Sequence, residues 1–289
     1  MDPDIAELME AALGSSIMRT DNVHGGDFAR AFRANLADGS SVFVKTHSNP
    51  PSGFFSTEAA GLAWLRAAGT LRVPEVLALS DEPAFLVLEW IDTGSRHFRV
   101  GSGTEARFGR RLAGLHAAGA ESFGRQDQRT TGSLALPNDP VESWADFYGH
   151  RRLIPLSKIA ERRRSLPVDS IRRLREVAMR LEDLLGLPEA PARLHGDLWA
   201  GNRLVDVNGN NWLIDPACFG GHREFDLAMM RLFGGFGDDA FAAYDEAFPL
   251  ADGWRDRIAL HQIAPLVVHA IKFGGGYVTA VAEALDQYG

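Results

Sequence analysis

Three polar side chains in the second half of the sequence have types and spacing that suit chemistry on phosphate groups. Asp197 lies five residues before Asn202, and Asp215 follows the pair Asn208-Gly209, which separates two apolar runs. Asn-Gly between such runs favours a β-hairpin. If these two residues form the turn, position 207 faces 210 and Asn202 faces Asp215 at the open end of the ribbon. Their oxygens would suit Mg²⁺, which keeps waters and takes phosphate oxygens as further ligands.

Asp197 adds a second carboxylate on the loop that enters the same ribbon. Phosphoryl transfer needs this division, because a metal neutralises the phosphates while a separate acceptor orients the attacking hydroxyl. An isolated Asp or Asn is more often a turn residue, so the prediction depends on the combined spacing. A longer loop would shift the register by about one residue and leave Asn202 and Asp215 at the same end.

The first third of the chain predicts a small sheet with helices. The pattern indicates a helix over the first 13 residues, strands near 17–23, 28–36 and 41–46, a helix over 56–68 and a buried strand over 84–91. Lys45 ends the third strand, and Glu58 lies in the first turn of the following helix. Taken alone, these positions are compatible with a solvated lysine and an ordinary first-turn glutamate.

Long helical patterns dominate after residue 93. They cover 105–118, 143–153, 170–185 and most of the last 35 residues, with an interruption at 274–276. A β-rich first third followed by a helix-rich remainder predicts an α+β protein of two lobes. We expect the two lobes at 1–92 and 93–289.

Composition excludes several classes of protein. The 289 residues are 45% hydrophobic, which excludes a disordered chain, and the one cysteine excludes a disulfide framework. The net charge of −8 disfavours a general nucleic-acid binder, although 151–180 carries ten basic against three acidic residues. We interpret that stretch as a solvated helical surface rather than a patch for an acidic partner. With no long apolar run and an acidic N-terminus, a soluble cytoplasmic protein is expected.

The segment from His195 to Asn202, His-Gly-Asp-Leu-Trp-Ala-Gly-Asn, resembles the catalytic loop of the aminoglycoside-phosphotransferase-like branch of the protein-kinase fold, as does Ile-Asp-Pro at 214–216. The finer resemblance is to the fructosamine kinase (ketosamine 3-kinase) family, which 221–224, 232–236 and 273–277 also match. It implies a protein-kinase-like fold with a small antiparallel-sheet lobe that binds the nucleotide, at 1–92, and a mostly helical catalytic and substrate lobe with a catalytic hairpin, at 93–289. It also implies ATP-dependent phosphorylation of the 3-hydroxyl of a ketosamine, a fructosamine- or ribulosamine-type adduct.

The resemblance assigns roles to individual residues. Asp197 would accept the hydroxyl proton, and Asn202 and Asp215 would bind Mg²⁺. For ATP, the implied residues are Lys45, Glu58, the loop glycines Gly25 and Gly26, and the hinge residues Glu89 and Ile91. Trp199 would line the sugar site, whereas His222, Arg223 and Glu224 could contact substrate or brace their loop. His195 and Asp226 would support the catalytic loop.

Several alternatives stay open at this point. The same chemistry would serve a kinase of another hydroxylated amine, of aminoglycoside or choline type. A non-catalytic nucleotide-binding scaffold is disfavoured, because every catalytic position holds a competent residue. The expected partner is a small ketosamine or glycated amine, with neither nucleic acid nor membrane. Cys218 is interpreted as a small packing residue, and the sequence predicts neither the preferred sugar nor the oligomeric state.

Overall fold

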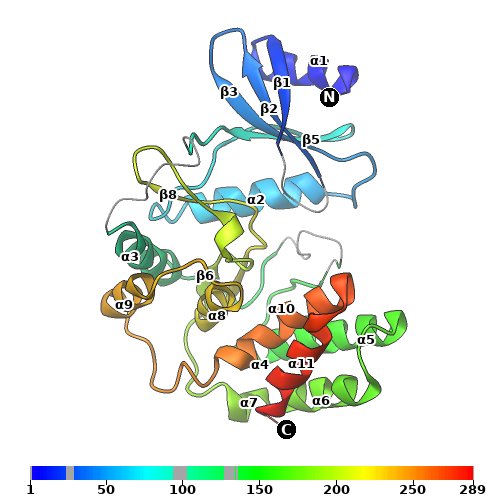
Figure 1. The fold of residues 1–289 in the computed structure, drawn as a ribbon, viewed down its shortest axis with the longest axis vertical. Helices are drawn as coiled ribbons and strands as arrows, with labels where there is room; N and C mark the ends of the chain where they lie inside the picture. The colour runs from blue at the N-terminus through cyan, green and yellow to red at the C-terminus, as the bar shows by residue number, and fades with distance from the viewer. Residues whose placement is uncertain (1, 24–28, 94–102, 127–133, 135, 289) are drawn as a thin grey trace. The chain divides into compact units, whose positions relative to one another are not determined.

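The computed structural model describes residues 2–23, 29–93, 103–126, 134 and 136–288 (Figure 1). The chain divides into two compact units. The first comprises the described parts of Met1–Thr104 together with Arg203–Ala217, and the second those of Glu105–Thr130, Leu134–Asn202 and Cys218–Gly289. The expected lobes, 1–92 and 93–289, differ from these units mainly in the segment Arg203–Ala217.

The first unit is built on a five-stranded antiparallel sheet. Its strands are β1 (Ile17–Val23), β2 (Arg30–Leu36), β3 (Ser41–Thr46), β4 (Val76–Asp81) and β5 (Ala84–Glu89), in the spatial order β1-β2-β3-β5-β4. The turn between β2 and β3 is closed by Asp38, whose carboxylate accepts hydrogen bonds from the backbone N–H and hydroxyl of Ser40. The strands expected near 17–23, 28–36, 41–46 and 84–91 all occur within a few residues of their predicted bounds.

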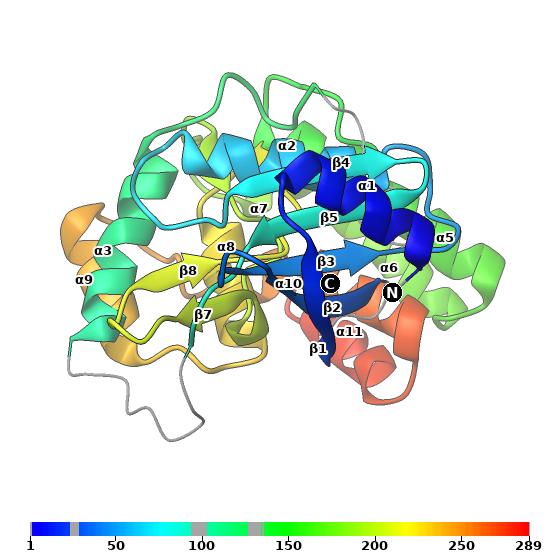
Figure 2. The same ribbon diagram turned by 90° about the horizontal axis from the view of Figure 1, so that it is seen from above.

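Helices α1 (Pro3–Leu13) and α2 (Phe54–Arg66) pack on this sheet, and Figure 2 shows α1 crossing it. Alternate side chains of a strand face opposite sides. Val42 and Val44 of β3 accordingly pack in the apolar cluster that includes Ile5 and Met9 of α1. Lys45, one position further, points to the other side, toward α2.

The hairpin of β7 (Arg203–Val205) and β8 (Asn211–Leu213) also belongs to the first unit. Arg203 pairs with Leu213 and Val205 with Asn211, so the predicted register, with 202 facing 215, is wrong by one residue. The cause is a longer loop. The Asp206 carboxylate accepts hydrogen bonds from the backbone N–H groups of Asn208 and Asn210, and Gly209 takes a positive φ of 76°.

The second unit is mostly helical, as expected. Its strands β6 (Ala192–Leu194) and β9 (Phe219–Gly221) pair antiparallel, and a 3-10 turn, η2, covers Ala200–Asn202. Its helices are α3 (Thr104–Ala117), α4 (Trp144–Asp146), α5 (Ile154–Arg163), α6 (Val168–Met179), α7 (Leu181–Leu184), α8 (Glu224–Leu232), α9 (Asp238–Ala247), α10 (Ile258–Phe273) and α11 (Gly276–Asp286). Within the predicted helix 143–153, residues Phe147–Leu153 form a π-helix, whose i→i+5 bonds were not anticipated.

The interior of this unit is aromatic. The Trp144 ring stacks with Phe147, Tyr148 and Phe219 at centroid distances of 5.7, 5.1 and 6.3 Å. Such large rings supply much of the buried apolar area of a core. Because Phe219 belongs to β9 and Phe147 and Tyr148 to the π-helix, this stacking holds the two elements together.

The basic stretch 151–180 is engaged in contacts within its own unit. Arg172 pairs with Asp169 and Glu176 at 2.6 Å, and Arg175 with Glu161 at 2.6 Å. These pairs support the interpretation as a solvated helical surface. In the described part of the chain, no helix is both long and apolar enough to cross a membrane.

Candidate active site

A buried lysine with two carboxylate partners forms the phosphate-binding candidate of the first unit. Residues 55, 58, 62 and 65 share one face of α2, so Glu58 lies in an apolar stripe turned toward the sheet. Its Oε1 is 2.6 Å from the Lys45 Nζ, and the Asp215 Oδ1 is 2.5 Å from the same atom. Burial lowers the pKa of Lys45, but the two carboxylates outweigh it and the pKa is raised, so the ammonium keeps its charge.

Asp215 reaches this lysine from an uncommon backbone conformation. Its φ of 52° is in the left-handed region, which costs a non-glycine residue about 1–2 kcal/mol. Residues held in this way cluster at functional sites. The Asp215 side chain is 38% exposed, whereas that of Glu58 is 6% exposed. The more accessible carboxylate is therefore the one that was expected to bind metal.

The other nucleotide candidates fall at two places. Glu89 ends β5 opposite Val42, and both Glu89 and Ile91 are half-buried in the first unit. The backbone N–H of Glu89 donates to the Glu75 carbonyl at 2.9 Å. Gly25 and Gly26 lie outside the described residues.

The loop after β6 carries the catalytic candidate and is held by a buried carboxylate. Asp226, fully buried in the first turn of α8, accepts the backbone N–H of His195 at 2.7 Å and that of Gly196 at 2.9 Å. The His116 ring, bonded to the Tyr244 hydroxyl at 2.8 Å, lies 3.3 Å from the same carboxylate. Bonds to a charged acceptor are about twice as strong as neutral ones. They fix the loop backbone just before Asp197.

The side-chain amide of Asn202 also holds Asp197 through two hydrogen bonds. Its Nδ2 donates to the Asp197 backbone carbonyl at 2.9 Å and to the Asp197 Oδ2 at 3.1 Å. Asp197 is half-buried, and its own N–H points to the His195 Nδ1 at 3.3 Å. The structure thus brings Asp197, Asn202, His195 and Asp226 together in the second unit. The predicted partner of Asn202, Asp215, belongs to the first unit.

Trp199 projects from the same loop. Its side chain is 40% exposed, and its ring lies 6.1 Å from that of Phe233, edge to face. A Cβ at Gly201 would lie 2.2 Å from the Trp199 ring, so only glycine leaves room for the indole here. The Phe233 ring in turn lies 4.9 Å from His269, which is 5.0 Å from Tyr277. Trp199 is thus the first of four aromatic rings in contact, which continue through Phe233 and His269 to Tyr277.

His222, Arg223 and Glu224 are 4%, 4% and 2% exposed. Arg223 makes a double contact with Glu189 at 2.7 and 2.8 Å, and it also donates to the carbonyls of Phe248 and Pro249. Arg257 grips Glu224 with two hydrogen bonds of 2.9 and 2.6 Å. These contacts favour the bracing alternative over direct contact with substrate.

Sequence reasoning missed the partners of these groups. Glu189, Arg257 and His261 come from separate segments, and no spacing in the sequence connects them to the motif around Glu224. Gly201 was missed as well: glycine permits the close approach of another group, but the sequence does not tell that the Trp199 ring lies over it.

Comparisons with known proteins identify relatives of this chain. The family model for fructosamine kinase matches residues 1–288. The mouse ketosamine-3-kinase is 31% identical over 295 residues, covering 93% of this chain and 95% of that protein. A solved protein of Thermobifida fusca with a provisional fructosamine-3-kinase assignment is 37% identical, with a TM-score of 0.90 and 99% of each chain covered.

A more distant structure supports the fold alone. Macrolide 2′-phosphotransferase type I is 18% identical, with a TM-score of 0.62 over 99% of this chain and 97% of its own. The expected protein-kinase-like α+β fold is thereby confirmed. Together with a family model that spans nearly every residue, these likenesses show that the chain belongs to the fructosamine kinase family.

Proposed function

We propose that this protein is an ATP-dependent kinase that phosphorylates the 3-hydroxyl of ketosamines. The observation that carries the proposal is the catalytic loop, where Asp197 is held between the Asp226-bound backbone and the amide of Asn202. Family membership supports the reaction class, since relatives are named ketosamine-3-kinase and protein-ribulosamine 3-kinase. A kinase of aminoglycosides or choline is less favoured, because such proteins share only the fold.

Each side chain has a part in this proposal. Asp197 orients the substrate hydroxyl and accepts its proton as the bond to phosphorus forms. Lys45 binds the α- and β-phosphates of ATP while Glu58 holds its ammonium in place. Trp199 offers an exposed ring face against which a sugar can pack.

Mg²⁺ fits the oxygens proposed for it. The carboxylate of Asp215 and the amide oxygen of Asn202 are hard donors of the kind that Mg²⁺ prefers. Because the Nδ2 of Asn202 is used on Asp197, its Oδ1 is the end suited to a cation. When bound, the ion would neutralise charge on the phosphates.

Two measurements test the proposal. ATP consumption should be fastest with free ketosamines or glycated lysine and slow with aminoglycosides or choline, and the reverse order would refute the substrate class. Asp197→Asn should reduce kcat by at least about 100-fold and leave nucleotide affinity nearly unchanged. Normal turnover in that variant would refute the mechanism, and ATP binding without turnover on any hydroxylated amine would favour a non-catalytic scaffold.

A further inference from the structure

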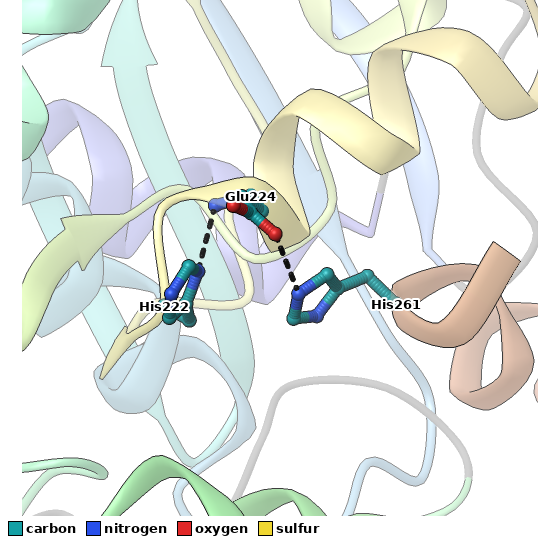
Figure 3. Close-up of side chains that lie close together, drawn as sticks. All are labelled: His222, Glu224 and His261. Atoms are coloured by element: carbon teal, nitrogen blue, oxygen red, sulfur yellow. Dashed lines mark hydrogen bonds and ion pairs between the residues drawn. The ribbon is translucent and has the colours of Figure 1, made fainter. Parts of the chain in front are cut away.

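A buried group of two histidines and a glutamate lies beside the start of α8. His222 follows β9, Glu224 begins α8, and His261 lies in the first turn of α10. One nitrogen or oxygen from each lies within 4.8 Å of the others, and all three residues are at most 4% exposed. Figure 3 shows both imidazole rings lying against Glu224. The proposed catalytic roles use none of these side chains.

The imidazole ring of His261 is fully buried, yet its nitrogens make no hydrogen bonds within the described part of the chain. Its Nε2 instead faces the Glu224 Oε2 at 3.4 Å, beyond the usual length of an N–H···O bond. A buried polar group without a partner is rare in native proteins and calls for an explanation such as an ion.

The 3.4 Å separation is the one expected of two ligands on a single zinc ion. Zn²⁺ binds imidazole nitrogen and carboxylate oxygen at about 2.0–2.2 Å in tetrahedral geometry, which places neighbouring ligand atoms about 3.4 Å apart. His222 is the third donor. Its ring lies 5.4 Å from that of His261, at 21° between planes. Two histidines and a glutamate are a common zinc ligand set.

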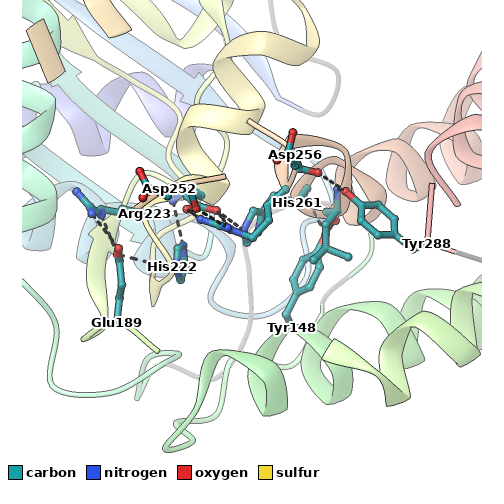
Figure 4. Close-up of polar contacts among 11 residues, drawn as sticks. Tyr148, Glu189, His222, Arg223, Asp252, Asp256, His261 and Tyr288 are labelled. Carbon is teal, nitrogen blue, oxygen red and sulfur yellow. Dashed lines mark hydrogen bonds and ion pairs between the residues drawn. The ribbon is translucent and has the colours of Figure 1, made fainter. Parts of the chain in front are cut away.

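Surrounding groups orient these donors. Arg257 donates to both oxygens of Glu224, as groups around a ligating carboxylate commonly do. The Tyr148 hydroxyl donates to the carbonyls of Leu260 and His261 at 2.8 and 3.0 Å, which fixes the start of α10. Figure 4 shows Glu189 between Arg223 and His222, with its Oε2 3.9 Å from the His222 Nε2.

The charges near the group are balanced. Glu189 and Glu224 face Arg223 and Arg257, so an incoming dication meets no net positive charge from these four.

We propose that His222, Glu224 and His261 form a zinc site that ties α10 to the start of α8. The ion takes one imidazole nitrogen from each histidine, the Oε2 of Glu224 and a water as its fourth ligand, while Arg257 stays hydrogen-bonded to the Glu224 carboxylate. Asp226, two residues after Glu224, holds the catalytic loop, so the metal also stiffens the support of that loop.

The test is zinc binding to the full-length protein, purified with a chelator and dialysed. Millimolar Mg²⁺ is present throughout to occupy the proposed catalytic metal site. We expect one Zn²⁺ per chain by mass spectrometry, and a melting temperature at least about 5 °C higher when Zn²⁺ exceeds its Kd about 100-fold. His222→Asn and His261→Asn should each weaken zinc affinity at least about 100-fold. The exposed His150 provides the matched control, because His150→Asn should bind zinc like the parent protein.

Two outcomes would overturn the proposal. One is wild-type protein that binds no zinc at micromolar concentrations, and the other is zinc affinity that neither histidine variant changes. If the variants fail to fold, X-ray absorption of the zinc-loaded wild-type protein decides the question. Two imidazoles and one carboxylate as the protein ligands of the ion support the site, and any other set of protein ligands rejects it. None of these readouts depends on kinase activity.

Discussion

Replacing Asp226 with asparagine tests whether one buried carboxylate holds the catalytic loop. Asp226→Asn keeps the shape of the side chain but removes its charge and turns one acceptor oxygen into an N–H₂ group. That group would face the backbone N–H of either His195 or Gly196, which now donate to the carboxylate at 2.7 and 2.9 Å. One of the two bonds must be lost, and a buried N–H is left without an acceptor.

The magnitude follows from these contacts. A hydrogen bond to a charged group contributes about 1.5–3 kcal/mol to stability. For a domain of 150–250 residues, each kcal/mol lowers the melting temperature by about 2–4 °C, so Asp226→Asn should lower it by about 3–12 °C. Asp197 lies directly after the two anchored residues, and a displacement of about 1 Å at a catalytic group can cost about 100-fold in rate. We therefore expect kcat to fall by about 10- to 100-fold.

The assay is thermal unfolding together with steady-state turnover on a ketosamine. Asp239→Asn is the matched control, because Asp239 is exposed in the first turn of α9 and should change stability by less than about 1 kcal/mol. Nucleotide affinity should be almost unchanged in both variants, since Lys45 and its partners lie in the other unit. If Asp226→Asn matches the wild type in both stability and kcat, the anchoring role of this carboxylate is refuted.

Three further changes test other parts of the site. Lys45→Met should weaken ATP binding and lower the free energy of unfolding by about 3–5 kcal/mol, because Glu58 loses its buried partner; calorimetric titration that finds normal ATP affinity would contradict the assignment. Gly201→Ala should raise the KM for ketosamine much more than the KM for ATP, because the new Cβ displaces the Trp199 ring. A KM for ketosamine that is unchanged, or that rises by the same factor as the KM for ATP, would contradict a sugar contact. Asp206→Asn should destabilise the hairpin at pH 7 but not in acid. Burial raises the Asp206 pKa, but hydrogen bonds from Trp212, Asn210 and Asn208 lower it below 3.8. The carboxylate therefore stabilises the fold above about pH 4, and this contribution is lost as the pH falls through the folded-state pKa. An unfolding difference that is independent of pH would be evidence against it.

The local signals in the sequence were strong where one segment decides its own structure. The Asp38-Gly39 turn placed β2 and β3, and the strand pattern placed Lys45 near the end of β3. The spacing of Asp197 and Asn202 also held, because a single short loop brings them together. Such features depend on turn chemistry and periodicity, which a single sequence contains.

Features that depend on distant segments could not be predicted. The hairpin register was missed by one residue because the Asp206 side chain, rather than Asn208-Gly209 alone, determines the loop. The bracing of Glu224 by Arg257, 33 residues later, leaves no pattern in the sequence. The π-helix at 147–153, whose Phe147 and Tyr148 rings stack with Trp144, likewise has no local pattern that marks it in the sequence.

The two carboxylates on Lys45 differ in a way that suggests how the site accommodates its ligands. Glu58 is almost fully buried, so separating its carboxylate from the Lys45 ammonium would leave an unpaired charge in a low-dielectric environment. Asp215 is 38% exposed, so it can leave the lysine at a much smaller cost. An ammonium has three donors, two of which are used on these carboxylates. We infer that Glu58 is the permanent brace, whereas Asp215 is the exchangeable partner that can turn to a cation when phosphate takes its place on Lys45.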